Sequence, residues 1–243
     1  MKKRFPLCFS LLIVSACSKF KVPEFSAATI AINESNVDMI LNARFHNASA
    51  QDNSFSWYKD YAIDFPDSVE ENYTSYCETG EIYGNIEKDI IRSDRNFLLV
   101  DMKFDECLFS SSADLITING NIDLDSTFYS SSDDYFSITQ GNYKITTFNT
   151  QFVFSQHYYE IDYTEKSDEV IIKEYSKIEI KVNNKSIGTV NFYTDTPYEA
   201  LAQSIEGEDI IEGANKSKIR IKYSTKDTKV YLNNSLYATY TNN

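Results

Sequence analysis

The chain has 243 residues, a formal net charge of −13 at pH 7 and 42% hydrophobic residues. Such an acidic chain is unsuited to nucleic acid, because nucleic-acid binding depends on cationic contacts to phosphate. Its 14% aromatic content, with only 7 glycines and 4 prolines, also excludes a disordered or collagen-like protein. The length allows one large all-β domain or two small domains.

The first 17 residues have the organisation of a secretory signal. The basic residues Lys2 to Arg4 precede an apolar run at residues 5–16, as in the n-region and h-region of a signal peptide. The run is shorter than the roughly 20 apolar residues that span a bilayer. Residues 14–17 read Val-Ser-Ala-Cys, which resembles the lipobox of bacterial lipoproteins. The resemblance implies that cleavage follows Ala16 and that the Cys17 sulfur is acylated.

The acyl chains expected on Cys17 would hold the protein at a membrane. Each buried CH₂ group contributes about 0.8 kcal/mol, and two or three chains together give durable anchoring. Ser18 follows the cysteine; among the lipoproteins that the motif resembles, a residue other than aspartate at this place implies the outer membrane. We therefore expect a lipid-anchored protein of the bacterial cell envelope, on the outer membrane and facing the periplasm. An ordinary cleaved signal peptide with an incidental cysteine is the alternative.

The expected organisation is a signal peptide at residues 1–16, a lipidated tether at 17–27 and a single β-rich domain at 28–243. The tether contains Pro23 and small polar residues, which would lift the domain from the membrane. No change of composition and no linker rich in proline or glycine divides the β-rich part. A division near residue 165 is the alternative.

The four cysteines divide by their positions. Cys8 lies in the expected signal peptide and Cys17 is the expected lipid acceptor, which leaves Cys77 and Cys107. An oxidising periplasm permits a disulfide between these two residues. The loop of about 30 residues that it would close corresponds to roughly 3–4 kcal/mol of stability in the chain-entropy model. Two free, buried thiols are the alternative.

The first expected element of the domain is a helix of about eleven residues. Ser35 stands three residues before Asp38, which places an acceptor at the helix cap and a negative charge in the first turn. The apolar residues of this segment recur with helical spacing. They are Val37, Ile40, Leu41 and Phe45. We expect the helix to end near residues 46–47.

From Phe55 onward, the spacing of the apolar residues becomes that of strands. Alternation is clearest at residues 100–105 and 116–125, where one face is apolar and the other polar, as in an antiparallel sheet covered on one side. Further strands are expected at 143–147, 152–154, 159–163, 170–172, 178–182, 190–193, 219–223, 230–232 and 236–240. Turns with asparagine or glycine, which tolerate positive φ, are expected at 140–142, 183–185 and 233–235. One short helix is expected at 196–205.

Three short segments of the β-rich part resemble a recurring arrangement in uncharacterised proteobacterial lipoproteins. They are Cys77-Glu78-Thr79-Gly80, Phe104-Asp105-Glu106-Cys107 and Ile118-Asn119-Gly120. Those proteins begin with a short helix and continue as a long β-meander. The resemblance implies this fold and a disulfide between Cys77 and Cys107, and it implies no activity.

The sequence contains no motif for catalysis or metal binding. His46 and His157 have no ligand-like partner two or four residues away, and the sequence has no HExxH or GxSxG motif. The carboxylates at 123–125, 133–134 and 206–212 lack the spacing of a calcium loop, and we expect them on solvated faces. We therefore expect no catalytic residue, metal or cofactor, and no enzyme.

One run of basic residues opposes the acidic balance of the chain. Lys216, Lys218, Arg220 and Lys222 alternate along one expected strand. Such a stripe could bind an anionic partner, for example lipopolysaccharide phosphates or an acidic protein surface. Outward lysines also protect the exposed edge of a sheet, and we favour this second interpretation.

These patterns predict a mainly β protein, in which one short amino-terminal helix packs on a long, curled antiparallel sheet that forms an open barrel or a sandwich. The expected function is a non-enzymatic binding or structural module of the cell envelope, held at the membrane by acyl chains on Cys17, with an envelope protein or glycan as a further partner. A carrier or chaperone for an apolar ligand is the alternative, in which Val100, Phe104, Ile118 and Leu124 line an empty hollow. An envelope hydrolase is a third hypothesis, and it requires a histidine or a carboxylate pair to converge in a cleft.

Overall fold

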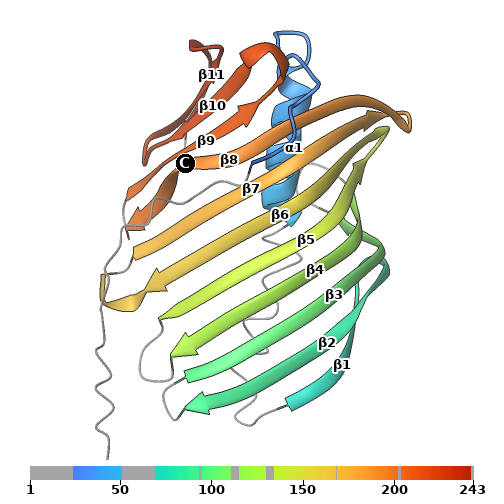
Figure 1. Ribbon diagram of the computed structural model, residues 1–243, viewed down its shortest axis with the longest axis vertical. Helices are drawn as coiled ribbons and strands as arrows, with labels where there is room; N and C mark the ends of the chain where they lie inside the picture. The colour runs from blue at the N-terminus through green and yellow to red at the C-terminus, as the bar shows by residue number, and fades with distance from the viewer. Residues whose placement is uncertain are drawn as a thin grey trace, which may run out of the picture.

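In the described part of the chain, one amino-terminal helix packs against one antiparallel sheet (Figure 1). The part of the chain that the computed structural model describes comprises residues 24–50, 69–92, 95–110, 115–129, 134–167, 169–201 and 204–241. Cys17 and the expected signal peptide lie outside these residues.

Twelve strands form a single sheet, and their spatial order is their order in the sequence. The strands are β1 (Val69–Tyr76), β2 (Thr79–Arg92), β3 (Arg95–Ser110), β4 (Leu115–Tyr129), β5 (Tyr135–Thr147), β6 (Thr150–Thr164), β7 (Glu169–Val182), β8 (Lys185–Leu201), β9 (Ser204–Glu212), β10 (Lys218–Tyr223), β11 (Asp227–Leu232) and β12 (Ser235–Thr241). All neighbouring strands are antiparallel. The predicted mainly β meander is therefore confirmed.

The sheet is open, and the expected curl into a barrel or a sandwich was wrong. Among the described residues, β1 pairs only with β2 and β12 pairs only with β11, so the two edges do not meet and no second sheet faces the first. Helix α1 (Val37–Ala50) lies across one face of the second half of the sheet (Figure 1). The helix thus supplies the apolar partner that a closing or a facing sheet would otherwise have to provide.

Helix α1 confirms the predicted helix and extends it to Ala50. Val37, Ile40 and Leu41 are buried and belong to the same apolar cluster as the inward residues of the sheet. Phe45 is 40% exposed and contacts Tyr240 of β12 edge-to-face. The helix is therefore held from the centre of the sheet to its last strand.

The helix begins with a turn around Asn33, so the predicted cap at Ser35 was wrong. The Asn33 side-chain oxygen accepts hydrogen bonds from the Ser35 backbone N–H at 2.9 Å and from the Ser35 hydroxyl at 2.6 Å. The Val37 N–H donates to the Asn33 carbonyl at 3.0 Å. A capping serine would accept a hydrogen bond from a backbone N–H of the first helical turn. The Ser35 hydroxyl instead donates to Asn33, whose side chain closes this turn.

The inward face of the sheet follows the predicted alternation. In the register of β3 and β4, Val100 lies opposite Leu124 and Met102 opposite Ile122, and all four are buried. The later strands continue this face with large apolar side chains. These are Phe152, Phe154, Ile178, Ile180, Val190, Phe192, Ile219, Ile221 and Val230.

Two of the predicted turns are confirmed, whereas one turn and the second helix were wrong. Asn183-Asn184 and Asn233-Asn234 have positive φ at both residues and connect tight hairpins. Residues 140–142 lie inside β5, where the ladder has an irregularity. Residues 196–201 belong to β8 and 204–205 to β9. Pairing of β8 with a strand on each side outweighs the local helical preference of an alanine-leucine segment.

The predicted disulfide between Cys77 and Cys107 is present. Cys77 lies between β1 and β2, Cys107 lies in β3, and their Cα atoms are 5.3 Å apart. The bond closes a sequence separation of 30 residues. It therefore ties the first hairpin to the third strand, at the β1 edge of the sheet.

We predict that the double variant Cys77→Ser/Cys107→Ser loses roughly 3–4 kcal/mol of unfolding free energy, because the reduced chain gains conformational entropy when it unfolds. Urea unfolding with and without a reductant measures the loss. The reductant should destabilise the parent and leave the double variant unchanged. Equal stability of parent and variant without reductant would contradict the prediction.

Candidate functional site

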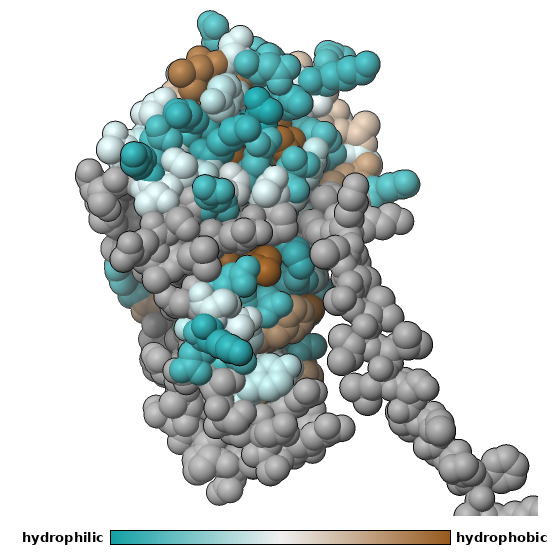
Figure 2. Space-filling view, turned by 90° about the vertical axis from the view of Figure 1, so that its left-hand side faces the viewer, coloured by the Kyte–Doolittle hydropathy of each residue, from teal (hydrophilic) through white to brown (hydrophobic). Residues whose placement is uncertain are grey.

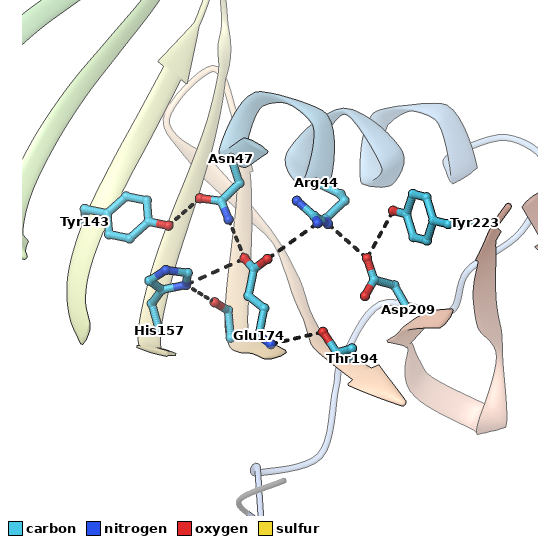
Figure 3. Close-up of polar contacts among 9 residues, drawn as sticks. Arg44, Asn47, Tyr143, His157, Glu174, Thr194, Asp209 and Tyr223 are labelled. Atoms are coloured by element: carbon cyan, nitrogen blue, oxygen red, sulfur yellow. Dashed lines mark hydrogen bonds and ion pairs between the residues drawn. The ribbon is translucent and has the colours of Figure 1, made fainter. Parts of the chain in front are cut away.

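A buried polar network joins helix α1 to six strands of the sheet (Figure 3). It lies between the apolar side chains of the helix and those of the inward face. Its members are Arg44 and Asn47 of α1, Tyr143 of β5, His157 of β6, Glu174 and Ser176 of β7, Thr194 of β8, Asp209 of β9 and Tyr223 of β10. We call these nine residues the helix–sheet clamp.

Arg44 is the cation of the clamp, and it binds two carboxylates. Its Nε donates to Asp209 Oδ2 at 3.1 Å, and its Nη2 lies 3.5 Å from Glu174 Oε2. The side chain is only 11% exposed and both carboxylates are fully buried. The guanidinium also lies 5.2 Å from the centroid of the Phe192 ring. One side chain of the helix thus fixes β7, β8 and β9 together.

Neutral donors also bind the two carboxylates. The Asn47 amide donates to Glu174 Oε1 at 2.6 Å, and the Tyr143 hydroxyl donates to Asn47 Oδ1. The Tyr223 hydroxyl donates to Asp209 Oδ2 at 3.1 Å. Burial, and next the Glu174 charge, raise the pKa of Tyr143 well above its ordinary value. Tyr143 therefore stays protonated and remains a donor at neutral pH.

His157 is a neutral member of the clamp. Its Nδ1 is hydrogen-bonded to Ser176 Oγ at 2.7 Å and lies 3.9 Å from Glu174 Oε1. Burial, and next the Arg44 charge, lower the pKa of His157 to about 3. The ring is therefore uncharged at neutral pH, when it contacts Tyr143 and Phe154 edge-to-face.

The clamp brings a serine, a histidine and a glutamate together, but not in the order that proton relay requires. In a catalytic triad the serine and the carboxylate bind opposite nitrogens of the imidazole ring. In the clamp, Ser176 and Glu174 both lie on the Nδ1 side of His157. All three residues are buried. This arrangement orients the helix on the sheet.

The structure places the other sequence-predicted residues apart from the clamp. His46 lies beside the Phe152 ring, at 6.0 Å between ring centroids, and lines a shallow pocket of about 400 Å³ with Phe148. Asp123 and Asp125 lie on the outward face of β4, away from the core. Within the described ranges, no three histidine, cysteine or carboxylate side chains are arranged to hold a metal ion.

The basic stripe crosses an interior strand, so its interpretation as edge protection was wrong. Arg220 and Lys222 belong to β10, which is paired on both sides, and both lie close to Glu208 of β9, at 3.6 and 3.2 Å. Lys218 begins the same strand, and Lys216 precedes it in the turn Ala214–Lys216. The two cations in the second half of the stripe thus share one carboxylate, while its first half lies at the end of the sheet.

Sequence reasoning considered His157 only as a candidate for catalysis or metal binding, which it set aside, and it missed the charged residues of the clamp. Glu174 is followed at two-residue spacing by Ser176, Ile178 and Ile180, all of them buried. A carboxylate in register with inward residues is the signal that would have identified it. Comparisons of the chain with protein-family models, with curated proteins and with solved structures found no match.

We predict that Arg44→Ala lowers the unfolding free energy by about 3–5 kcal/mol at pH 7, because it leaves two buried carboxylates without their cation. Urea unfolding measures the change. The matched control is Lys181→Ala, which removes a partly exposed ion pair with Glu179 and should cost less than about 1 kcal/mol. Neutralising the carboxylates by Glu174→Gln and Asp209→Asn should recover part of the loss. A loss no larger than that of the control would contradict the assignment.

The low pKa of His157 predicts a pH dependence of stability with a defined sign. The unfolded chain takes up this proton near the ordinary histidine pKa of 6.5, whereas the folded protein resists protonation down to about 3. The neutral His157 ring therefore makes its full contribution to the unfolding free energy above pH 6.5. This contribution is lost as the pH falls toward 3, at up to about 1.4 kcal/mol per pH unit.

The variant His157→Gln should remove this slope. Unfolding free energies of parent and variant, measured in urea between pH 6.5 and 4.5, should converge as the pH falls. The difference between the two slopes cancels the contribution of carboxylates common to both. Parallel slopes would show that the buried ring is not neutral.

Proposed function

We propose that the protein is a lipoprotein of the bacterial cell envelope, anchored through Cys17, that acts as a non-enzymatic binding or structural module. The observation that carries the proposal is the disulfide between Cys77 and Cys107, because such bonds persist in oxidising compartments outside the cytosol. It accounts for two of the four cysteines and leaves Cys17 of the lipobox for the lipid. Both features agree with export across the inner membrane.

Attachment to the membrane is assigned to the acyl chains. No helix in the described part of the chain is long and apolar enough to cross a bilayer. The proposed anchor, Cys17, precedes residue 24, which is the first residue that the structure describes. We assign the anchor to the outer membrane, with the sheet on its periplasmic side.

A role in binding or structure fits a helix held by a buried clamp. The clamp engages the helix and six strands, and its ionisable groups are turned toward one another. The outward face of the sheet, with Asp101, Asp123 and Asp125 on β3 and β4, is left for contact with another molecule. An envelope protein or glycan is the partner that we propose for it.

The core gives the carrier hypothesis less support than the module hypothesis. Val100, Phe104, Ile118 and Leu124 are buried in one apolar cluster with residues of helix α1. The pockets beside Glu212, His46 and Leu236 do not include them. A carrier would need these side chains to separate before a ligand could enter.

We predict that the protein extracted from membranes begins at Cys17 and carries a thioether-linked diacylglycerol. Mass spectrometry of the intact protein tests this, because it reads both the cleavage site and the added lipid. The matched control Cys8→Ser should give the same mature mass as the parent, since residue 8 is removed, whereas Cys17→Ser should lose the lipid. An unmodified Cys17, or a chain that retains Met1, would overturn the proposal.

Crosslinking of the membrane-bound protein, followed by its purification, distinguishes the module from the carrier. Recovery of one stoichiometric envelope protein supports the module. Lipid that co-purifies without a protein partner, in excess over the anchor, supports the carrier.

A further inference from the structure

Six of the connections between the described strands lie at one end of the sheet. In a meander, every turn from an odd-numbered to an even-numbered strand lies at the same end; the turns after β5 and β7 are on the right in Figure 1. Exposed apolar residues and unpaired lysines gather on the last four of these turns. We call this set the rim: Phe148, Lys185, Ile187, Lys216, Lys218 and Leu236.

The rim is a continuous surface because hydrogen bonds link its turns. The Asn183 N–H donates to the Asn149 carbonyl at 2.8 Å, which joins the β5–β6 turn to the β7–β8 turn. The Asn233 N–H donates to the Lys218 carbonyl at 2.9 Å, which joins β9–β10 to β11–β12. Between these pairs runs the segment that precedes the helix.

This segment bonds to both halves of the rim. The Thr29 N–H donates to the Thr189 carbonyl at 2.9 Å, and the Ala214 N–H donates to the Ile30 carbonyl at 2.6 Å. A Cβ atom on Gly188 would lie 2.6 Å from Ile30 Cγ1. Only a residue without a side chain allows this close approach, so the amino-terminal segment is fixed along the rim.

Three large apolar side chains of the rim face solvent. Phe148 is 88% exposed, Leu236 is 60% exposed and Ile187 is 44% exposed. Phe148 also has a φ of 48°, a conformation that costs roughly 1–2 kcal/mol for a residue with a side chain and that glycine or asparagine adopts more easily. A strained aromatic residue that gains nothing from burial points to a role outside the fold.

The rim is basic within an acidic protein. Lys185, Lys216 and Lys218 form no ion pair with any residue in the described ranges. The nearby Glu212 accepts a hydrogen bond from the Tyr193 hydroxyl at 2.8 Å. Glu34, which lines a pocket with the rim residue Leu236, is a second nearby carboxylate. Three lysines thus stand against two carboxylates, while the whole chain has a formal charge of −13. The turns themselves contain asparagine, at positions 149, 183, 184, 233 and 234.

The opposite end of the sheet has a different character. Its described turns carry Asp134, Glu165, Glu169 and Asp227 against Lys166 and Lys226. Figure 2 looks at this end, where the described residues are mainly hydrophilic. The combination of exposed apolar side chains with unpaired cations is therefore a property of the rim and not of both ends of the sheet.

We propose that the rim binds the surface of a membrane that contains anionic lipids. Apolar side chains that enter the interface, together with lysines near the headgroups, are the two contributions that hold peripheral proteins at such membranes. The proposal deepens the envelope function proposed above, since it assigns a second contact to the membrane that Cys17 would anchor. The acyl chains hold the protein at the membrane, and the rim sets which end of the sheet faces it.

The length of the tether permits both contacts. Phe25 lies beside Tyr175, at 5.9 Å between ring centroids, and Tyr175 is seven residues before the end of β7 at the rim. Seven strand residues span about 23 Å. Cys17 lies seven positions before Glu24. A fully extended chain of this length reaches about 23–25 Å, which matches the distance along β7 from Tyr175 to the rim. The anchor and the rim can therefore touch the same bilayer.

The experiment uses a single tryptophan as a reporter of lipid contact. In the full protein, purified from membranes and reconstituted in vesicles of phosphatidylethanolamine and phosphatidylglycerol, Trp57→Phe removes the only native tryptophan. Phe148→Trp then places the reporter in the rim. The matched control Leu99→Trp places it on β3, at a residue that is 36% exposed and near the opposite end.

Brominated lipids should quench the reporter at position 148 and leave the reporter at position 99 unchanged. The triple variant Lys185→Gln/Lys216→Gln/Lys218→Gln should weaken the quenching at 148 severalfold when the vesicles contain phosphatidylglycerol. Far-ultraviolet circular dichroism confirms that each variant is folded. Equal quenching at both positions, or none at 148, would overturn the proposal.

The mass of Cys17 separates this result from the proposed anchor. Quenching at position 148 in a protein without acyl chains supports the rim and overturns the anchor. An acylated protein without quenching at position 148 keeps the anchor and overturns the rim.

Discussion

The position of the helix on the sheet depends on the Arg44 guanidinium and the two carboxylates that it binds, Glu174 and Asp209. Removing three charges from water is costly, and their mutual attraction repays the cost only when further hydrogen bonds saturate the carboxylates. Asn47 and Tyr223 provide such bonds. Because apolar contacts have no preferred direction, the polar contacts of the clamp determine how the helix lies across the strands.

This fixed helix has consequences for the surface of the protein. The segment before it, at residues 24–33, is tied to the end of the sheet by backbone hydrogen bonds, and the helix begins directly afterwards. The amino-terminal side of the domain and the rim are therefore one rigid unit. In the proposed function, a pull on the tether is transmitted to the rim and not to a flexible linker.

The sequence was sufficient for the parts of the fold that depend on local patterns. Alternation at residues 100–105 and 116–125 predicted the inward face of β3 and β4, and the paired asparagines at 183–184 and 233–234 predicted tight turns. The second helix failed as a prediction because pairing with two neighbouring strands, which no local window contains, decided the conformation of residues 196–205. Closure of the sheet was misjudged for the same reason.

The clamp was harder to predict than the fold because it joins distant residues. Asn47 and Glu174 are 127 positions apart, and Arg44 and Asp209 are 165 positions apart. An interpretation that places every charged residue in solvent therefore misses Arg44, Glu174 and Asp209. Arg44 and Asn47 do follow Ile40 at helical spacing, so the inward face of the helix was visible, whereas the identity of their partners was not.

The strand order has a consequence for how the chain reaches its native state. Each strand finds its partner in the segment that precedes it, so pairing can advance hairpin by hairpin as a chain emerges from a pore with its amino terminus first, and short-range contacts of this kind form rapidly. The hydrogen bond from Arg44 to Asp209 can form only after most of the polypeptide has emerged. A helix made at the outset is thus fixed in place late, only after β9 has joined the sheet.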